Sequence, residues 1–238
     1  MLAKETLARA RTILQDETSV RWPLAELCDW LNDGLREIAA LKSSAFARTD
    51  DLILVEGVKQ SLPAGVARLL RPIANAPFVG SDRMPRMPVT VTDQALLDAV
   101  TPDWHSERRK AQQVRHVMFD EASPRTFYVY PSNNGTGRLR AVVSAVPPQV
   151  AASGAPTLIN SYSAEVPIED TYANLLLDYI LYRAFSKDSQ YAGAIQRAAA
   201  HFQQFASGMG VQVGAEASMS PNRKPRVAAA APGVTANA

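Results

Sequence analysis

The side chains of this sequence best suited to metal binding or acid–base chemistry are Asp103, His105, His116 and His201. The spacing of Asp103, His105 and His116 matches no compact metal motif such as His-x-x-x-His, and Cys28 is the single cysteine of the chain. His201 is expected on the polar face of a helix. We therefore expect no metal site and no cofactor, and we interpret the histidines as structural or solvent-facing residues.

Other catalytic patterns are also missing from the sequence. No Gly-x-Ser-x-Gly segment presents a serine nucleophile. Loop 133–137 contains glycines but lacks the Gly-Lys-Ser/Thr ending of a phosphate-binding loop and leads into a strand, so it is expected to be a turn. Cys28 lies among leucines in a helical pattern, which favours a small buried side chain over a reactive thiol. We predict a protein that is not an enzyme; a hydrolase with an acid–base pair around His105 or His116 is an alternative.

The charges of the chain are nearly balanced. Its 238 residues include 25 basic and 23 acidic side chains, and a formal net charge of +2 does not mark a nucleic-acid binder. Short basic clusters at Arg108-Arg109-Lys110 and Arg223-Lys224-Pro225-Arg226 keep a nucleic-acid-binding module as a second alternative. The first residues mix acids and bases without a long apolar segment, so neither a signal peptide nor a membrane helix is predicted. We expect a protein made in the cytoplasm, without membrane contact.

Both ends of the chain have helical periodicity. Helices are predicted over residues 2–15 and from Pro23 to about Leu41, and a third from Pro167 to a connection at residues 186–188. A final helix has a packing seam at residues 191, 195, 198, 202, 205 and 209 and is expected to end at Gly208 and Gly210. These helices should pack as an antiparallel bundle that buries most of the aromatic residues, including Phe202, together with Ile195.

The middle of the chain has the short alternating runs that are typical of β-strands. A hairpin is predicted from strands 52–55 and 58–62, and the following prolines, Pro72 among them, indicate a loop region. A short helix over 93–100 is expected to be capped by Asp93. The strands expected to complete one small antiparallel sheet are 114–119, 126–130 and 139–146.

The predicted fold class is therefore α+β. The expected organisation is a helical bundle from residues 1–46 and 165–210, a β-rich insertion at 47–164 and an extended C-terminal arm at 211–238. The arm has few large apolar residues, so it cannot fold by itself and is expected to bind a neighbouring protein. Its expected contact residues are apolar or basic: Met219, Pro221, Arg223, Lys224, Arg226 and Val227.

The order of several short segments resembles the bacteriophage head-to-tail adaptor, or connector, family. The resemblance covers about residues 5 to 210, and the family is similar in role to the tail tubular protein A of short-tailed phages. Its most distinctive segments are Leu14-Gln15-Asp16 with Arg21-Trp22, Trp104-His105, Tyr128-Val129-Tyr130-Pro131, and Tyr182-Arg183-Ala184 with Lys187-Asp188. None of these segments is a catalytic motif.

The resemblance implies a structural protein of the virion at the interface between head and tail. It implies a homo-oligomeric, dodecameric ring that binds the portal protein on one side and a tail nozzle or tail tube protein on the other. Genomic DNA would pass through the ring without specific binding. The loop residues that would contact the next ring are Asn133, Asn134, Gly135, Thr136 and Gly137.

Overall fold

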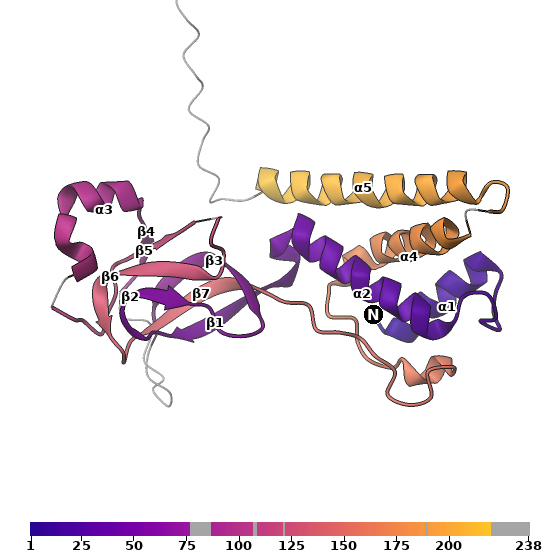
Figure 1. Ribbon diagram of the computed structural model, residues 1–238, viewed down its shortest axis with the longest axis horizontal. Coiled ribbons are helices and arrows are strands. Elements are labelled where there is room, and N and C mark those ends of the chain that lie inside the picture. The colour runs from indigo at the N-terminus through magenta and orange to yellow at the C-terminus, as the bar shows by residue number, and fades with distance from the viewer. Residues whose placement is uncertain (77–86, 107–108, 121, 189, 220–238) are drawn as a thin grey trace, which may run out of the picture.

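The computed structural model describes residues 1–76, 87–106, 109–120, 122–188 and 190–219 (Figure 1). Within these residues the protein is mixed α+β, with five α-helices and two sheets. Four helices lie at one end of the molecule, and the strands lie at the other end with the remaining helix, α3. The helices are α1 (Ala3–Leu14), α2 (Leu24–Leu41), α3 (Gln94–Val100), α4 (Ala173–Lys187) and α5 (Ala194–Met219). The expected fold class is confirmed at this level.

Helix α4 is in contact with α1, α2 and α5, which share one apolar core. Helix α2 approaches α4 closely at Gly34, where an added Cβ would lie 3.1 Å from side-chain atoms of Leu176 and Tyr179. A larger residue at this position would push the two helices apart. The helix that was predicted to start at Pro167 is α4. It begins only at Ala173, after a 3-10 turn at Asp170–Tyr172.

Aromatic residues of α4 and α5 form much of this core. Tyr179 is 7% exposed and packs edge-to-face against Phe205, which is 1% exposed, with ring centroids 5.2 Å apart. The prediction that Ile195 and Phe202 are buried is wrong, because they are 60% and 47% exposed. The face of α5 that packs on α4 carries Phe205 instead, and Phe202 only touches Tyr182 at the edge of the core.

Helix α5 also runs further than the sequence suggested. Gly208 and Gly210 do not end it, and the helix continues to Met219. At Gly208 the helix lies directly on Leu175, whose Cδ2 would be 2.3 Å from an added Cβ. The prediction of an extended arm from residue 211 is therefore wrong for residues 211–219, and residues 220–238 lie outside the described residues.

The strands form a three-stranded and a four-stranded sheet, in the orders β1-β7-β3 and β2-β6-β5-β4. All pairs are antiparallel except β4 with β5. The strands are β1 (Ala47–Ile53), β2 (Glu56–Ser61), β3 (Val66–Asn75), β4 (Thr90–Val91), β5 (His116–Phe119), β6 (Thr126–Asn134) and β7 (Arg138–Ala145).

Two predictions about these strands are wrong. Strands β1 and β2 do not pair as a hairpin, because β1 pairs with β7 and β2 pairs with β6, in different sheets. The segment around Pro72 is not a loop: it is part of β3, the edge strand of its sheet, which pairs with β7 and tolerates the proline next to a register shift. The predicted single sheet is therefore two sheets, which bury their facing side chains in one shared apolar core.

Buried asparagines connect distant segments of the chain. Asn32 of α2 donates to the carbonyl of Val150 and accepts from its N–H, both at 2.8 Å. Asn75 of β3 exchanges the same pair of hydrogen bonds with Val114, also at 2.8 Å. Each amide satisfies both backbone groups of a buried residue, so these side chains fix loops that no strand or helix would hold.

The outer face of the four-stranded sheet is covered by α3. The predicted cap is confirmed, because the Asp93 side chain accepts from the N–H of Ala95. Leu97 of α3 packs with Trp104 and with Met118 of β5 in a small separate cluster. This cluster lies on the side of the sheet opposite to the shared core, as strand alternation requires.

Candidate partner-contact surfaces

The three histidines are in separate places and each has a structural neighbour. His105 stacks on Trp104, with ring centroids 3.7 Å apart. The Nδ1 of His116 lies 2.8 Å from the hydroxyl oxygen of Thr90. His201 lies on α5 with its Nδ1 2.9 Å from Asp178 of α4. The structure therefore does not bring the histidines together into one site.

No metal or thiol chemistry is supported by the described residues. They contain no group of three or more His, Cys, Asp or Glu side chains that could hold a metal ion. Cys28 is buried, its Sγ lies 3.4 Å from the carbonyl oxygen of Val150, and burial raises the pKa of the thiol to about 11. At neutral pH the thiol is protonated and inaccessible, so it is a packing residue.

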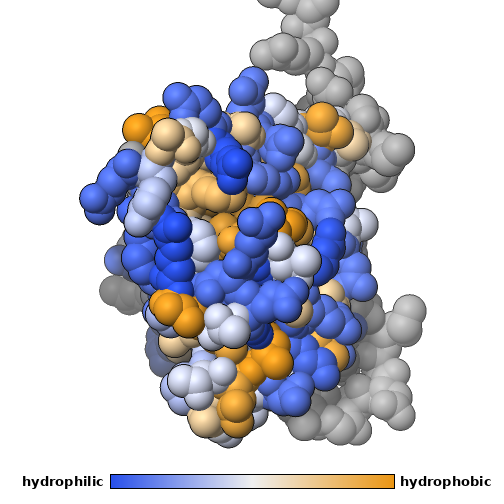
Figure 2. Space-filling model, turned by 90° about the vertical axis from the view of Figure 1, so that its right-hand side faces the viewer, coloured by the Kyte–Doolittle hydropathy of each residue, from blue (hydrophilic) through white to orange (hydrophobic). Residues whose placement is uncertain are grey.

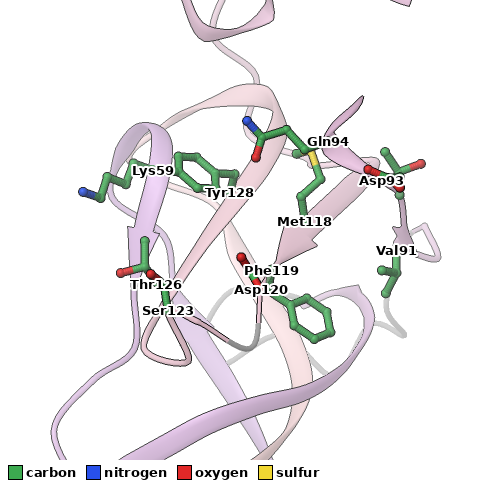
Figure 3. Close-up of a pocket in the computed structure, with 11 residues that line it drawn as sticks. Lys59, Val91, Asp93, Gln94, Met118, Phe119, Asp120, Ser123, Thr126 and Tyr128 are labelled. Atoms are coloured by element: carbon green, nitrogen blue, oxygen red, sulfur yellow. The ribbon is translucent and has the colours of Figure 1, made fainter. Parts of the chain in front are cut away.

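A polar hollow of about 660 Å³ lies on the four-stranded sheet between β5, β6 and the start of α3 (Figure 3). Its carboxylates are already used by the backbone: Asp93 caps α3, and Asp120 accepts from the N–H of Ala122. Lys59 and Tyr128 lie across the hollow from Asp93. Because the carboxylates stabilise local turns, the hollow is better explained by the shape of the sheet than by an acid–base pair.

The connection between α1 and α2 is locked onto the connection between α4 and α5. Asp16 accepts hydrogen bonds from the backbone N–H groups of Val20, Arg21 and Trp22, at 2.9–3.0 Å. Burial opposes ionisation of this carboxyl, but the three hydrogen bonds outweigh it and hold the pKa of Asp16 below its usual value. The indole N–H of Trp22 donates to the carbonyl of Ala184 at 3.3 Å, which ties the first connection to α4.

Charged pairs complete this contact, which we call the elbow cluster and define by Asp16, Arg21, Trp22, Lys187 and Asp188. Arg21 pairs with Asp188 at 2.8 Å, and its guanidinium lies 3.9 Å from the ring centroid of Tyr191. Lys187 pairs with Glu26 at 2.5 Å. These are segments that carried the family resemblance in the sequence, and they meet in space although about 160 residues separate them.

A hollow of about 310 Å³ adjoins the elbow cluster. Ile13 and Tyr191, which are 48% and 60% exposed, lie on its rim with Arg21 and Arg197. Figure 2 faces this end of the molecule and shows apolar groups in the middle of a mostly hydrophilic surface. Ile13 of α1 therefore leaves nearly half of an apolar side chain exposed at this hollow.

The other segments of the resemblance also meet. Trp104 is fully buried and packs edge-to-face against Tyr128 of β6, with ring centroids 6.1 Å apart. The indole N–H of Trp104 donates to Asp98 of α3 at 2.7 Å. This contact holds α3 and the following turn on the sheet, so Trp104 and Tyr128 act as packing residues here.

The loop between β6 and β7 is only partly available to a partner. Asn133 and Gly137 are buried: the Asn133 side chain donates to the carbonyls of Ala111 and Gln112 and accepts from the N–H groups at both ends of the turn. Asn134, Gly135 and Thr136 are exposed at the tip of the loop. Asn133 therefore supports the loop from inside, and the tip is the surface that another protein can reach.

Parts of the two basic clusters and most of the arm lie outside the described residues. Lys110 forms an ion pair with Glu56, which neutralises part of the first cluster, while Arg108 lies outside the described residues. The second cluster, residues 223–226, and the other expected contact residues of the arm beyond Met219 also lie outside them. Met219 itself is the last residue of α5.

A family model for SU10 adaptor proteins matches residues 1–225. The chain belongs to the SU10 adaptor protein family. It is therefore a structural adaptor of a bacteriophage and a component of the virion, as expected from the sequence resemblance. A search of curated proteins found no match. This SU10 adaptor family is generally non-enzymatic, and its members interact with portal and tail proteins.

Among the described residues, none of the helices of this chain is both long and apolar enough to cross a bilayer. Its conspicuous surface features are instead exposed apolar side chains on helices. The largest of these residues on α5 are Ile195, Phe202, Val211 and Val213, which are 43–71% exposed.

Proposed function

We propose that this adaptor forms a dodecameric ring between the portal and the tail nozzle or tail tube, through which genomic DNA passes. In this role it would be similar to the tail tubular protein A of short-tailed phages. The observation that carries the proposal is the SU10 adaptor match over residues 1–225, which includes all of the described residues.

The packing of the molecule supports a stiff building block. The elbow cluster ties α1 and α2 to α4 and α5, and Asn32 ties α2 to the segment that returns from the sheets. We propose the organisation expected from the sequence, with the helical part formed by residues 1–46 and 165–210 and continued by α5 to Met219, and the β-rich part by residues 47–164. A ring subunit needs such rigidity because its contacts on all sides must keep a fixed geometry.

We assign the contact with the next ring to the tip of the loop between β6 and β7. Asn134, Gly135 and Thr136 are exposed there, and Asn133 and Gly137 hold the loop in its shape. Backbone and amide groups at the tip would make hydrogen bonds across the ring interface. The role of Asn133 and Gly137 in this contact would be indirect.

We assign a portal contact to the segment that follows α5. Its composition offers three cations, Arg223, Lys224 and Arg226, next to apolar Pro221 and Val227. Such a segment can cover a large surface of a partner while it contributes modest affinity per contact. The cations would pair with acidic groups of the partner, and Met219 would add an apolar contact at the end of α5.

DNA would pass without specific binding. A channel lined by arginine and lysine would hold the phosphates and slow the passage, so the surface that lines the ring is expected to be acidic or neutral. The nearly balanced charge of the chain, +2, is compatible with this expectation.

The proposal is tested by mixing the purified adaptor with portal rings of the same phage and examining the product by electron microscopy. The full chain should add a second ring to the portal. A variant that ends at Met219 should keep the helical signal in circular dichroism but fail to attach. A full-length variant with Asn134→Ala and Thr136→Ala should attach to the portal normally and recruit the tail protein less well. No second ring with the full chain would contradict the proposed function.

A further inference from the structure

Helix α5 carries a second packing seam beside the one that it uses. The residues that face α4 follow the alternating four-three spacing of helix packing, at positions 194, 198, 201, 205, 208 and 212. A shift by one residue gives a set with the same spacing in which every side chain is apolar. This second seam consists of Ile195, Ala199, Phe202, Ala206, Met209 and Val213.

Most of the second seam is uncovered. Ile195 is 60% exposed, Phe202 is 47% exposed and Val213 is 43% exposed, whereas Met209 is buried within the chain. Ala199 and Ala206 are exposed between them. A helix face that is apolar along five turns is more than a few scattered exposed side chains, and it is typical of a surface that packs against another helix.

The seam also lacks charge. Residues 198–215 contain no Asp, Glu, Lys or Arg, and His201 on the other edge of the helix is the only titratable side chain among them. Nucleic acid is therefore excluded as the occupant, because its binding depends on cations that neutralise phosphates. Depletion of charge with small and aromatic side chains is instead characteristic of the core of a protein–protein interface.

The position of the seam favours a neighbour at the side of the molecule. Helix α5 runs parallel to the longest axis of the molecule and along the outside of the helical part (Figure 1). From Ile195 to Val213 the seam spans 18 residue steps, or roughly 27 Å at the rise of an α-helix. The rings above and below a subunit contact its ends, whereas copies within a ring contact its long sides, so a seam along the long axis fits a second copy of the chain.

A complementary surface lies on the opposite side of the helical part. The edge of α5 away from the seam, with Ala194 and Arg197, lines the elbow hollow together with Ile13 of α1. Beyond it, α1 exposes the small side chains of Ala8 and Thr12, which line a shallow hollow of about 240 Å³ together with the charged residues Arg11 and Glu17. Small residues four positions apart on a helix allow another helix to approach closely.

We propose that the second seam of α5 packs against the outer face of α1 of a second copy, with Phe202 toward the hollow at Ala8 and Thr12. The contact joins two different surfaces, so it is head-to-tail and can close into a ring. The choice of a second copy as the partner and the closure into a ring both rest on the function proposed above. A strip roughly 27 Å long and about 10 Å wide is only about a third of the ~800 Å² per partner of a typical stable interface. Single pairs should therefore be weak, and copies should join mainly where a portal gathers them.

The test compares three lysine substitutions with a matched control on portal rings. Phe202→Lys and Ile195→Lys place a charge in the seam, and Ala8→Lys places one on the proposed counter-surface. Gln204→Lys places the same charge on the exposed side of α5 away from the seam. Adaptor copies per portal are counted by mass photometry, and folding is checked by circular dichroism.

We expect the wild type and Gln204→Lys to form complete rings. Phe202→Lys, Ile195→Lys and Ala8→Lys should each need at least about tenfold higher concentration to do so, because each introduces a buried unpaired charge into the same contact. Complete rings of Phe202→Lys at the control concentration would overturn the proposal. If the seam variants form complete rings but fail to recruit the tail protein, the seam binds that protein. If ring formation is lost with the seam variants but not with Ala8→Lys, the seam binds the portal. Either result also overturns the proposal. If the wild type binds no portal, the proposed function fails instead, and the contact is then tested by concentration-dependent association of the chain alone.

Discussion

Two phenylalanines three residues apart on α5 provide a direct measure of how this helix is oriented. Phe205 is 1% exposed and packs on Tyr179, whereas Phe202 is 47% exposed. Replacing a buried phenylalanine by alanine removes its transfer free energy and leaves a cavity, which together cost about 3–5 kcal/mol. At Phe202 about half of the side chain is already in water and no closed cavity forms, so its loss should cost about 1 kcal/mol.

The assay is urea unfolding followed by the helical circular dichroism signal, with Phe205→Ala and Phe202→Ala compared in the same chain. Phe205→Ala should lower the free energy of unfolding by roughly 2–4 kcal/mol more than Phe202→Ala. The two variants change the same side chain on the same helix, so intrinsic helix propensity cancels between them. Equal losses, or a larger loss at Phe202, would refute the packing of α5 on α4 described above.

Three further substitutions test other contacts. Asn32→Ala leaves the N–H of Val150 buried without a partner and its carbonyl with only the weak Cys28 thiol donor, and it should cost about 2–4 kcal/mol in urea unfolding. Gly137→Ala would place a Cβ 2.3 Å from the Asn133 amide nitrogen and 2.5 Å from a backbone oxygen. The substitution should lower the free energy of unfolding by about 1–3 kcal/mol. A melting temperature equal to that of the parent would contradict this. Because the pKa of folded Asp16 lies below its unfolded value, its hydrogen bonds stabilise the protein above the unfolded pKa, and this contribution is lost as the pH falls through the folded pKa. Acid unfolding curves should therefore show a weaker dependence on pH below about 4 for Asp16→Asn than for the wild type.

Local patterns in the sequence were sufficient to find most of the helices. The cap at Asp93 and the start of α2 depend only on neighbouring residues. The cap was predicted correctly, and the predicted start at Pro23 is one residue early because Pro23 is the N-cap of a helix that begins at Leu24. The end of α5 was missed because glycine is also tolerated inside a helix where it allows close packing, as Gly208 does on Leu175.

Pairing between distant segments could not be predicted in the same way. A glycine between two aliphatic runs, as at Gly57, is a signal for a hairpin, but β1 pairs instead with β7, about 90 residues away. The predicted orientation of α5 was wrong for a related reason. Its two seams have equal spacing and differ by one residue, so periodicity alone cannot decide whether Phe202 or Phe205 faces α4.

For the partner contacts, the sequence indicated the segments but not which of their residues are exposed. Composition pointed to the segment after α5, which lies outside the described residues, and a glycine-containing pattern pointed to the loop of residues 133–137. Only the structure separates the buried Asn133 from the exposed tip of that loop. The family resemblance singled out the segments that contain the elbow cluster, but only the fold shows that they meet in space.

The hydrogen bonds between Asn32 and Val150 have a consequence for the order in which the chain folds. They join residues 118 positions apart, and α1 and α2 bury their apolar faces against helices that begin only at Ala173. The strands, in contrast, all lie between Ala47 and Ala145 and share a core of their own. During synthesis the sheets can therefore close while α4 and α5 are still unmade. The first two helices leave the ribosome early and must wait for the last two, so their apolar faces are the part of the nascent chain most in need of protection by chaperones.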